Sequence, residues 1–155
     1  MRRRGFIAHD STGDNDGFVI VQDPLWRAKD GKMNGALELD GIDDCVSTKS
    51  VLNPPQGPFS VFMQVKGGLP GEVFLSQKNG TDWLHTFPPK GLLMTILGQS
   101  GPLLAQVVIT DGQWHRIGFT WDGTNRTLYV DDVEAAKGAD MGLRKTTDRG
   151  KRILS

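Results

Sequence analysis

Seven dipeptides that favour tight turns recur along this 155-residue chain and divide it into short apolar segments. Asp-Gly and Asn-Gly tolerate the positive φ angles that the turn of a β-hairpin requires. The seven pairs are Asp16-Gly17, Asp30-Gly31, Asn34-Gly35, Asp40-Gly41, Asn79-Gly80, Asp111-Gly112 and Asp122-Gly123. A chain punctuated in this way favours strands joined by turns over long helices.

Apolar and polar residues alternate between these turns, which predicts an all-β fold. Ile117, Phe119 and Trp121 fall on one face of a strand, whereas Trp114 and Arg116 fall on the other. Segment 132–138 is the one candidate helix, and it is too short to be stable alone. The predicted strands are 17–22, 35–39, 44–47, 58–66, 72–77, 82–86, 91–97, 102–109, 113–121 and 126–131.

Two hairpins and a core follow from these strands. One hairpin joins 102–109 to 113–121, and the other joins 113–121 to 126–131. The strand lengths and turns indicate an antiparallel sandwich or barrel. The expected core residues are Phe59, Val61, Met63, Val65, Ile117, Phe119, Trp121, Leu128 and Val130.

Composition agrees with one folded domain. Hydrophobic residues make up 37% and charged residues 23%, which excludes a disordered chain. The single cysteine, Cys45, can form no internal disulfide, and we expect it to be a small buried residue. No apolar run approaches the roughly 18 residues of a membrane span. The basic start at 1–4 is followed by too few apolar residues for a signal peptide.

The formal net charge of zero hides basic ends around an acidic middle. Residues 1–4 hold three arginines, and residues 137–155 hold six basic residues against two acidic ones. We therefore expect a basic segment at 1–9, a sandwich at 10–138 and a basic polar tail at 139–155. The tail holds no aromatic residue for stacking on bases, so nucleic-acid binding is not expected.

Three segments together resemble the laminin-G-like domains of the concanavalin A-like lectin/glucanase superfamily. GALELDGIDDCV at 35–46 is similar to the family's opening motif, and PFSVFMQVK at 58–66 to its next core strand. WHRIGFTWDG at 114–123, followed by LYVDDV at 128–133, resembles its most recognisable hairpin. The resemblance covers roughly 10–136. It implies an antiparallel two-sheet jelly-roll β-sandwich that binds carbohydrate or protein, usually on secreted or surface-exposed proteins.

The two ends depart from this family pattern. Only nine residues precede the turn that begins at Asp10, where members carry a first strand, and 138–155 lacks their last-strand motif. The resemblance thus predicts a sandwich with an exposed sheet edge. Such an edge is a template for pairing, so a homodimer is expected. The alternative is a monomer in which residues 1–9 and 141–155 cover the edge.

Catalytic motifs are missing from the sequence. Glycosidases of the resembled superfamily place acidic residues as Glu-x-Asp-x-x-Glu on one strand face, and no such run occurs. Glu38 and Asp40 share a strand face but have no third acidic partner. Cys45 could pair with His85 or His115 as nucleophile and base, but neighbouring carboxylates disfavour a thiolate. We expect a protein that is not an enzyme and requires no cofactor.

Two acidic clusters offer the oxygen ligands that Ca²⁺ prefers. Their members are Asp10, Asp14 and Asp16 in the first cluster, and Asp40, Asp43 and Asp44 in the second. The first cluster does not fit an EF-hand, because its sixth position is Asn15 rather than glycine. Asx turns, in which a carboxylate caps its own backbone, are the explanation we favour for both clusters. Calcium binding and turn capping are therefore alternatives.

Carbohydrate sites combine aromatic rings that stack on sugars with polar groups that contact hydroxyls. Trp83 follows a turn and is the tryptophan we expect to face a ligand, whereas Trp121 belongs to the predicted core. Trp114, beside Arg116, could cover the sheet or stack on a ligand. The predicted ligand-binding residues are Trp83, Asp82, His85, Trp114 and Arg116.

The sequence therefore predicts a non-catalytic binding module that recognises a carbohydrate or a protein surface. The alternative is a truncated structural or self-assembling β-sandwich with no small-molecule ligand.

Overall fold

The computed structural model describes residues 6–20, 25–49, 57–77, 81–98 and 100–140, and these ranges contain strands and no helix. The all-β prediction is confirmed. The strands are β1 (Ile7–Ala8), β2 (Gly17–Ile20), β3 (Leu25–Gly31), β4 (Asn34–Glu38), β5 (Cys45–Ser47), β6 (Phe59–Lys66), β7 (Val73–Ser76), β8 (Asp82–Thr86), β9 (Leu92–Thr95), β10 (Leu103–Val108), β11 (Trp114–Trp121), β12 (Asn125–Val130) and β13 (Val133–Ala139).

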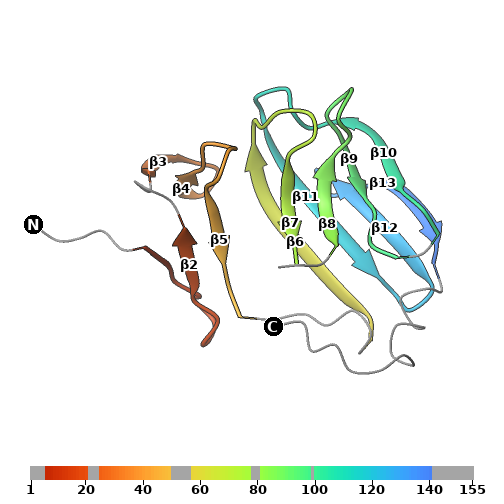
Figure 1. Ribbon diagram of the computed structural model, residues 1–155, viewed down its shortest axis with the longest axis horizontal. Coiled ribbons are helices and arrows are strands. Elements are labelled where there is room, and N and C mark those ends of the chain that lie inside the picture. Colours follow the sequence, from red (N-terminus) through yellow and green to blue (C-terminus); the bar gives the residue numbers. More distant parts are fainter. Residues whose placement is uncertain (1–5, 21–24, 50–56, 78–80, 99, 141–155) are drawn as a thin grey trace, which may run out of the picture. The chain divides into compact units, whose positions relative to one another are not determined.

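The chain divides into two compact units, residues 1–51 and 52–155. The segment predicted as one sandwich, 10–138, spans the boundary between them. In the first unit, β1, β2 and β5 form an antiparallel sheet, and β3 pairs with β4 in a separate hairpin (Figure 1). Asn34 closes that hairpin with a φ of 78°, a left-handed conformation that asparagine tolerates.

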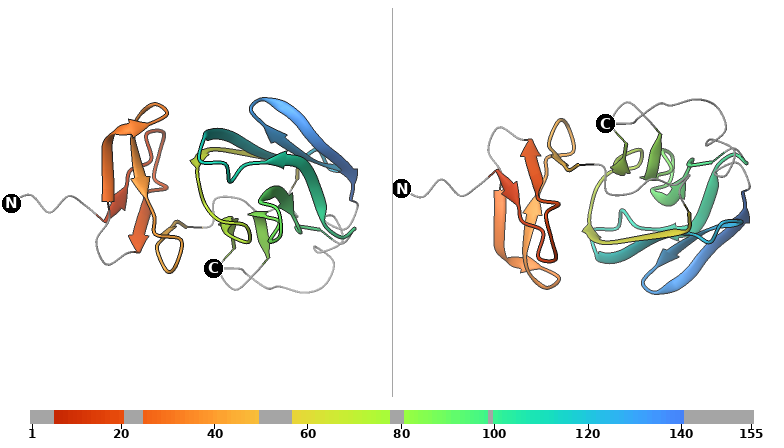
Figure 2. Two further views of the ribbon diagram at one scale, coloured as in Figure 1. Left: turned by 90° about the horizontal axis from the view of Figure 1, so that it is seen from above. Right: turned by 90° about the horizontal axis from the view of Figure 1, so that it is seen from below.

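The second unit is a β-sandwich of two four-stranded antiparallel sheets. The strand orders are β10-β9-β8-β7 and β13-β12-β11-β6. Figure 2 shows the two layers of this unit from above and below. Side chains from both sheets meet in one hydrophobic cluster between the layers. Its buried members are Trp83, Leu84, Leu93, Leu97, Ala105, Ile109, Ile117, Phe119, Trp121, Leu128 and Val130.

The core prediction holds where a strand has neighbours on both sides. The five predicted residues of β11 and β12 are at most 4% exposed. The four predicted residues of β6 pack against the cluster but are only half-buried. Strand β6 forms one edge of its sheet and pairs only with β11 among the described residues, so one flank of its side chains is open. Sequence alternation predicts which side of a strand faces inward, and sheet position decides how deeply it is buried.

Two local predictions are wrong. Segment 132–138, the candidate helix, lies largely in strand β13, because pairing with β12 overrides its weak helical preference. The predicted hairpin between 102–109 and 113–121 does not form, since β10 pairs with β9 in the other sheet. The buried Ile109 donates its N–H to the Gly91 carbonyl, so the chain crosses between sheets only after residue 109. The second predicted hairpin, between β11 and β12, is confirmed.

A buried ion pair closes the sandwich where β13 ends. Arg126 Nε lies 3.3 Å from Asp140 Oδ2, and both side chains are at most 2% exposed. Arg126 Nη1 also donates to the carbonyls of Leu97 and Gly101, which follow β9 in the opposite sheet. Ala139 and Asp140, the first residues of the segment expected to be a polar tail, therefore belong to the sandwich, and the rest of that segment, 141–155, lies outside the described residues.

Phe119→Ala should lower the free energy of unfolding by about 3–5 kcal/mol, because it leaves a cavity where a fully buried ring had packed. Urea denaturation measures the change. Val133→Ala is the control, since Val133 is 66% exposed and its truncation removes little packing. Equal stabilities of the two variants would contradict the assignment of Phe119 to the core.

Asp140→Asn should cost about 3–5 kcal/mol, because it leaves the Arg126 guanidinium buried without its counter-charge. The matched control is Asp132→Asn, which removes an exposed ion pair with Arg116 and should change stability far less. Chemical denaturation of both variants tests the contrast. A loss for Asp132→Asn as large as that for Asp140→Asn would show that burial is not what makes the Arg126 pair important.

Candidate functional site

The outer face of sheet β13-β12-β11-β6 is the side that points away from the core. Because Ile117, Phe119 and Trp121 point inward, the alternate residues of β11 point outward. Cross-strand partners share one side of a sheet, so the register places their partners in β6 and β12 on the same side. The residues that the register places on this outer face are Ser60, Phe62, Gln64, Lys66, Trp114, Arg116, Gly118, Thr120, Thr127 and Tyr129.

Two aromatic rings lie together at the centre of the outer face. Phe62 and Tyr129 are the two cross-strand partners of Gly118, and their ring centroids are 5.7 Å apart. A Cβ on Gly118 would come within 2.1 Å of Phe62 Cε1, so the ring lies where only glycine leaves room. Phe62 is 40% exposed. We call Phe62 and Tyr129 the aromatic platform.

The guanidinium group of Arg116 lies against the aromatic platform. The guanidinium carbon of Arg116 lies 4.7 Å from the centroid of the Phe62 ring, which is within cation–π range. Arg116 also pairs with the Asp132 carboxylate and donates its backbone N–H to Asp131 Oδ1 at 2.9 Å. The two aspartates belong to the β12–β13 turn and both have positive φ. This turn therefore holds Arg116 at its backbone through Asp131 and at its guanidinium through Asp132.

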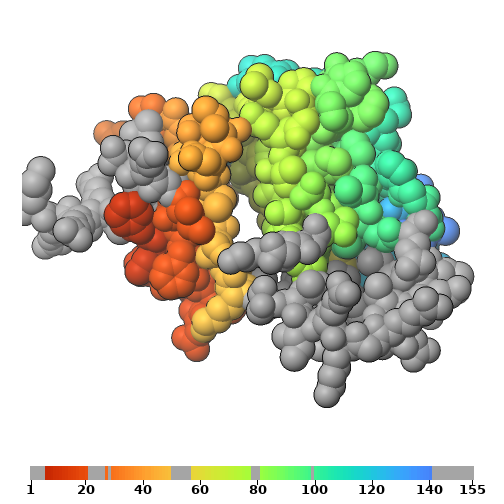
Figure 3. Space-filling model, in the orientation of Figure 1, coloured from red at the N-terminus to blue at the C-terminus, as the bar shows by residue number. Residues whose placement is uncertain are grey.

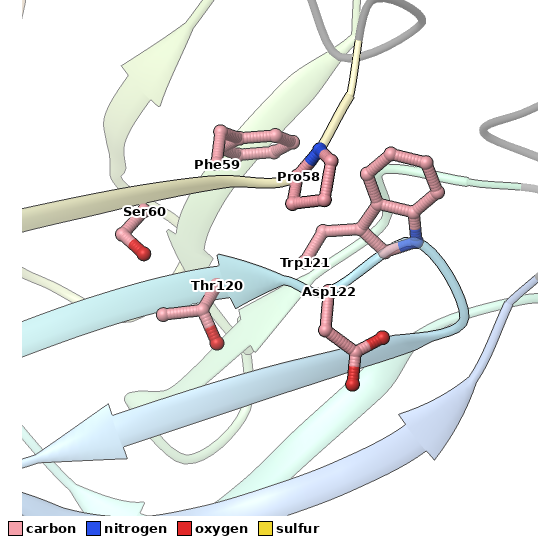
Figure 4. A pocket seen from close by; sticks show the side chains of 6 residues that line it. All are labelled: Pro58, Phe59, Ser60, Thr120, Trp121 and Asp122. Carbon is pink, nitrogen blue, oxygen red and sulfur yellow. The ribbon is translucent and has the colours of Figure 1, made fainter.

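A shallow open hollow of about 520 Å³ lies where β6 begins and the antiparallel strand β11 ends. Its lining residues are Pro58, Phe59, Ser60, Thr120, Trp121 and Asp122. Figure 4 shows that Ser60, Thr120 and Asp122 project to one side of the two strands, whereas the rings of Phe59 and Trp121 lie on the other. Ser60 and Thr120 are paired across the strands, two positions from Phe62 and Gly118. The hydroxyl side of the hollow therefore adjoins the aromatic platform.

Asp122 is a fixed negative charge in this hollow. Its Oδ1 accepts the backbone N–H groups of Asn125 and Thr124 at 2.7 and 2.8 Å, and its Oδ2 accepts the Asn125 side-chain amide. Hydrogen bonds from Asn125 hold the pKa of this carboxyl below its usual range. The outer face can therefore offer ring surfaces, a guanidinium, two hydroxyls and an ionised carboxylate, all of which suit a polyhydroxylated ligand.

Only part of the predicted ligand set lies on this outer face. Arg116 and Trp114 do, and Trp114 is half-buried opposite Lys66. Trp83 belongs to the core instead, which corrects the sequence-based expectation: it is 5% exposed and its ring centroid lies 5.5 Å from that of Phe59. Burial leaves no ring face open to a sugar.

Asp82 and His85 lie with Trp83 on β8, in the other sheet. This sheet, coloured yellow-green to teal, faces the viewer in Figure 3. Among the described residues, neither Trp83 Nε1 nor His85 Nε2 has a hydrogen-bond partner. Burial lowers the pKa of His85 against the opposing charge of Asp82, which favours a neutral ring. The predicted residues of β8 are thus separated from Trp114 and Arg116 by the core.

The two acidic clusters differ in geometry. In the described part of the chain, one trio of carboxylates has oxygens within 4.8 Å of one another, namely Asp40, Asp43 and Asp44. Asp40 Oδ1 accepts the backbone N–H of Ile42 at 2.8 Å, as in an Asx turn, and such hydrogen bonds lower the pKa of Asp40.

Asp10, Asp14 and Asp16 do not gather in this way. Asp10 Oδ1 caps Thr12, and Asp16 Oδ1 accepts the Asp10 N–H at 2.7 Å while its Oδ2 contacts His9. Backbone capping therefore engages carboxylates of both clusters. Cys45, expected to be buried, is exposed.

The sequence contained one signal for the aromatic platform. Phe62 breaks the alternation of β6 by placing an aromatic ring on the polar side of the strand. Gly118 and Tyr129 join it only through strand register, which the sequence does not specify. The hollow likewise depends on the pairing of Ser60 with Thr120.

Comparison of the chain with models of protein families, with curated proteins and with solved structures finds no match. Among the described residues, the structure contains no helix with the length and apolar character needed to cross a membrane.

Gly118→Val should displace the Phe62 ring and separate it from Arg116, because a side chain at position 118 needs the space that the ring occupies. In the parent protein, the Arg116 Hδ protons should show an upfield ring-current shift in NMR spectra, and this shift should disappear in the variant. Phe62→Ala supplies the reference spectrum without the ring. An unchanged Arg116 shift in both variants would contradict the contact.

Proposed function

We propose that this protein is a non-catalytic binding module whose outer face on sheet β13-β12-β11-β6 recognises carbohydrate. The observation that carries this proposal is the aromatic platform laid across Gly118, with an exposed ring beside a positioned guanidinium. Free ring surface that the fold does not bury is the feature that sugar-binding sites use for stacking.

The polar groups of the outer face fit the same ligand class. Sugar hydroxyls both donate and accept hydrogen bonds, so they can donate to Asp122 and exchange hydrogen bonds with Ser60 and Thr120. Arg116 can donate to a ring oxygen or to an acidic sugar. The two packed antiparallel sheets of residues 57–140 support a relationship to the laminin-G-like jelly roll, and we include that relationship in the proposal.

Self-assembly is the second candidate, and a separate observation favours it. In sheet β1-β2-β5, the register places Ile7, Phe18 and Ile20 on one side, and they are 39%, 61% and 54% exposed. An exposed apolar patch is an interaction surface or an aggregation hazard. Among the described strands, β6 has a partner on one side only, and its other edge is a second surface through which two copies could associate as a homodimer.

A glycan array probed with the full chain, in Ca²⁺ and in EDTA, tests the binding function. We expect saccharide binding that Phe62→Ala weakens about tenfold, in line with the contribution of one aromatic stacking contact. Phe18→Ala is the matched control, because it removes an exposed phenylalanine from a different sheet and should leave glycan binding unchanged. Loss of binding in EDTA would assign a role to the acidic clusters.

The same two variants separate the alternatives. A blank array for the parent protein, together with a stable dimer in light scattering that Phe18→Ala dissociates, would contradict the carbohydrate proposal and support self-assembly. Equal loss of glycan binding in Phe18→Ala and Phe62→Ala would show that the outer face is not the binding surface.

A further inference from the structure

His115 joins two chain segments through both of its ring nitrogens. Nδ1 lies 2.8 Å from Asp131 Oδ2, and Nε2 lies 3.1 Å from Asp111 Oδ1. The imidazole side chain is only 12% exposed, although the two aspartates are about half-exposed. A largely buried ring is thus held between two carboxylates at the surface.

The two aspartates belong to structurally distinct segments. Asp111 lies in the connection that carries the chain from β10 in one sheet to β11 in the other. Asp131 begins the turn between β12 and β13. His115 therefore ties the crossover between the two sheets to a turn at the same end of the sandwich.

Hydrogen-bond chemistry fixes the protonation state in which this arrangement is complete. An ionised carboxylate only accepts hydrogen bonds, and a neutral imidazole has one donor nitrogen and one acceptor nitrogen. A neutral ring would direct a lone pair at one of the two aspartates. Only the imidazolium ion, with a proton on each nitrogen, donates to Asp111 and Asp131 together.

In the described part of the chain, the charges that act on the His115 ring are those of Asp131 and Asp111. Strand β6 presents Val65 opposite His115 and Lys66 opposite Trp114. Arg116 is engaged with Asp132 and with the Phe62 ring. Burial of the ring works against protonation, but the hydrogen bonds and charges of Asp131 and Asp111 outweigh it, so the pKa of His115 is raised.

Asp131 and Asp111 differ in how firmly they are held. Asp131 Oδ1 accepts the Arg116 backbone N–H, and the Asp131 N–H donates to the Arg116 carbonyl at 2.8 Å. Asp111 Oδ1 makes the longer contact with the ring and has an alternative donor in the Gln113 N–H at 2.8 Å. Loss of the proton should therefore release Asp111 first.

We propose that His115 is a proton-dependent clasp that fastens the β10–β11 connection to the β12–β13 turn when the ring is doubly protonated and frees the connection when it loses a proton. The clasp rests on the two ring contacts and does not depend on the proposed ligand.

The sign of the pH dependence follows from the raised pKa. A histidine whose pKa is higher in the folded state stabilises the fold fully below its unfolded-state value of about 6.5. That stabilisation is lost as pH rises through the folded-state value. The difference in melting temperature between the parent protein and His115→Gln should therefore be larger at pH ~5.5 than at pH ~8.

NMR titration of the full chain tests the clasp directly. We expect His115 to titrate above about 6.5 and to show two protonated ring nitrogens in its ¹⁵N shifts on the acidic side of that titration. His115→Gln is the control, because it identifies the signals and amide shifts that belong to the His115 titration. The backbone amides of 110–113 should shift with the His115 titration, and those of the Asp131 turn should shift less.

Two conservative variants complete the test. Asp111→Asn and Asp131→Asn should each lower the His115 pKa, because each removes a charge that favours the imidazolium. If Asp131→Asn does not fold, Asp111→Asn alone gives the measurement. A His115 that titrates at or below about 6.5, or residues 110–113 that do not respond to its titration, would overturn the proposal.

Discussion

The buried pair of Arg126 and Asp140 is the contact on which the closed end of the sandwich depends. Removing two charges from water costs several kcal/mol per ion, and a buried pair offsets this only when its remaining polar atoms are also satisfied. Here the Leu97 and Gly101 carbonyls accept from the guanidinium, and the Ser100 N–H donates to Asp140 Oδ2. Arg126 Nε itself contacts Asp140 Oδ2 as an ion pair without hydrogen-bond geometry. The Asp140 carbonyl accepts the Trp121 indole N–H. One pair thus joins β11, β12, β13 and the segment after β9.

Glycine placement supports the same contact. Gly98 has a φ of 114°, and a Cβ at this position would meet Asp140 Oδ2 at 1.9 Å. A larger residue at position 98 would therefore be strained in its backbone and would collide with the carboxylate. The segment after β9, the ion pair and the end of β13 therefore depend on one another. Local sequence patterns do not predict such a long-range contact.

Much of the fold could be predicted from local chemistry, because alternation and turn residues act within a few positions. All ten predicted strands are present with small changes at their ends. Strand β13 was not predicted, because its Ala, Glu and Lys residues favour a helix locally. Pairing with β12 makes this segment a strand. The crossover after β10 was not predicted, because a turn sequence such as Asp111-Gly112 is compatible with two outcomes. The strand that follows it can pair with the preceding strand or join another sheet. The buried position of Trp83 could not be predicted because its place after a turn indicated exposure, whereas packing against Phe59 decides its position.

The central position of β11 has a consequence for the order of folding. The β11–β12 and β12–β13 pairs connect neighbours in sequence, so their loop-closure entropy is small. The β6–β11 pair instead joins segments tens of positions apart, and non-local pairing slows folding. During synthesis, β6 must therefore wait, with Phe59, Val61 and Met63 exposed, until most of the sandwich has emerged from the ribosome. The strand that completes the sheet is thus the one most open to misassociation in the nascent chain.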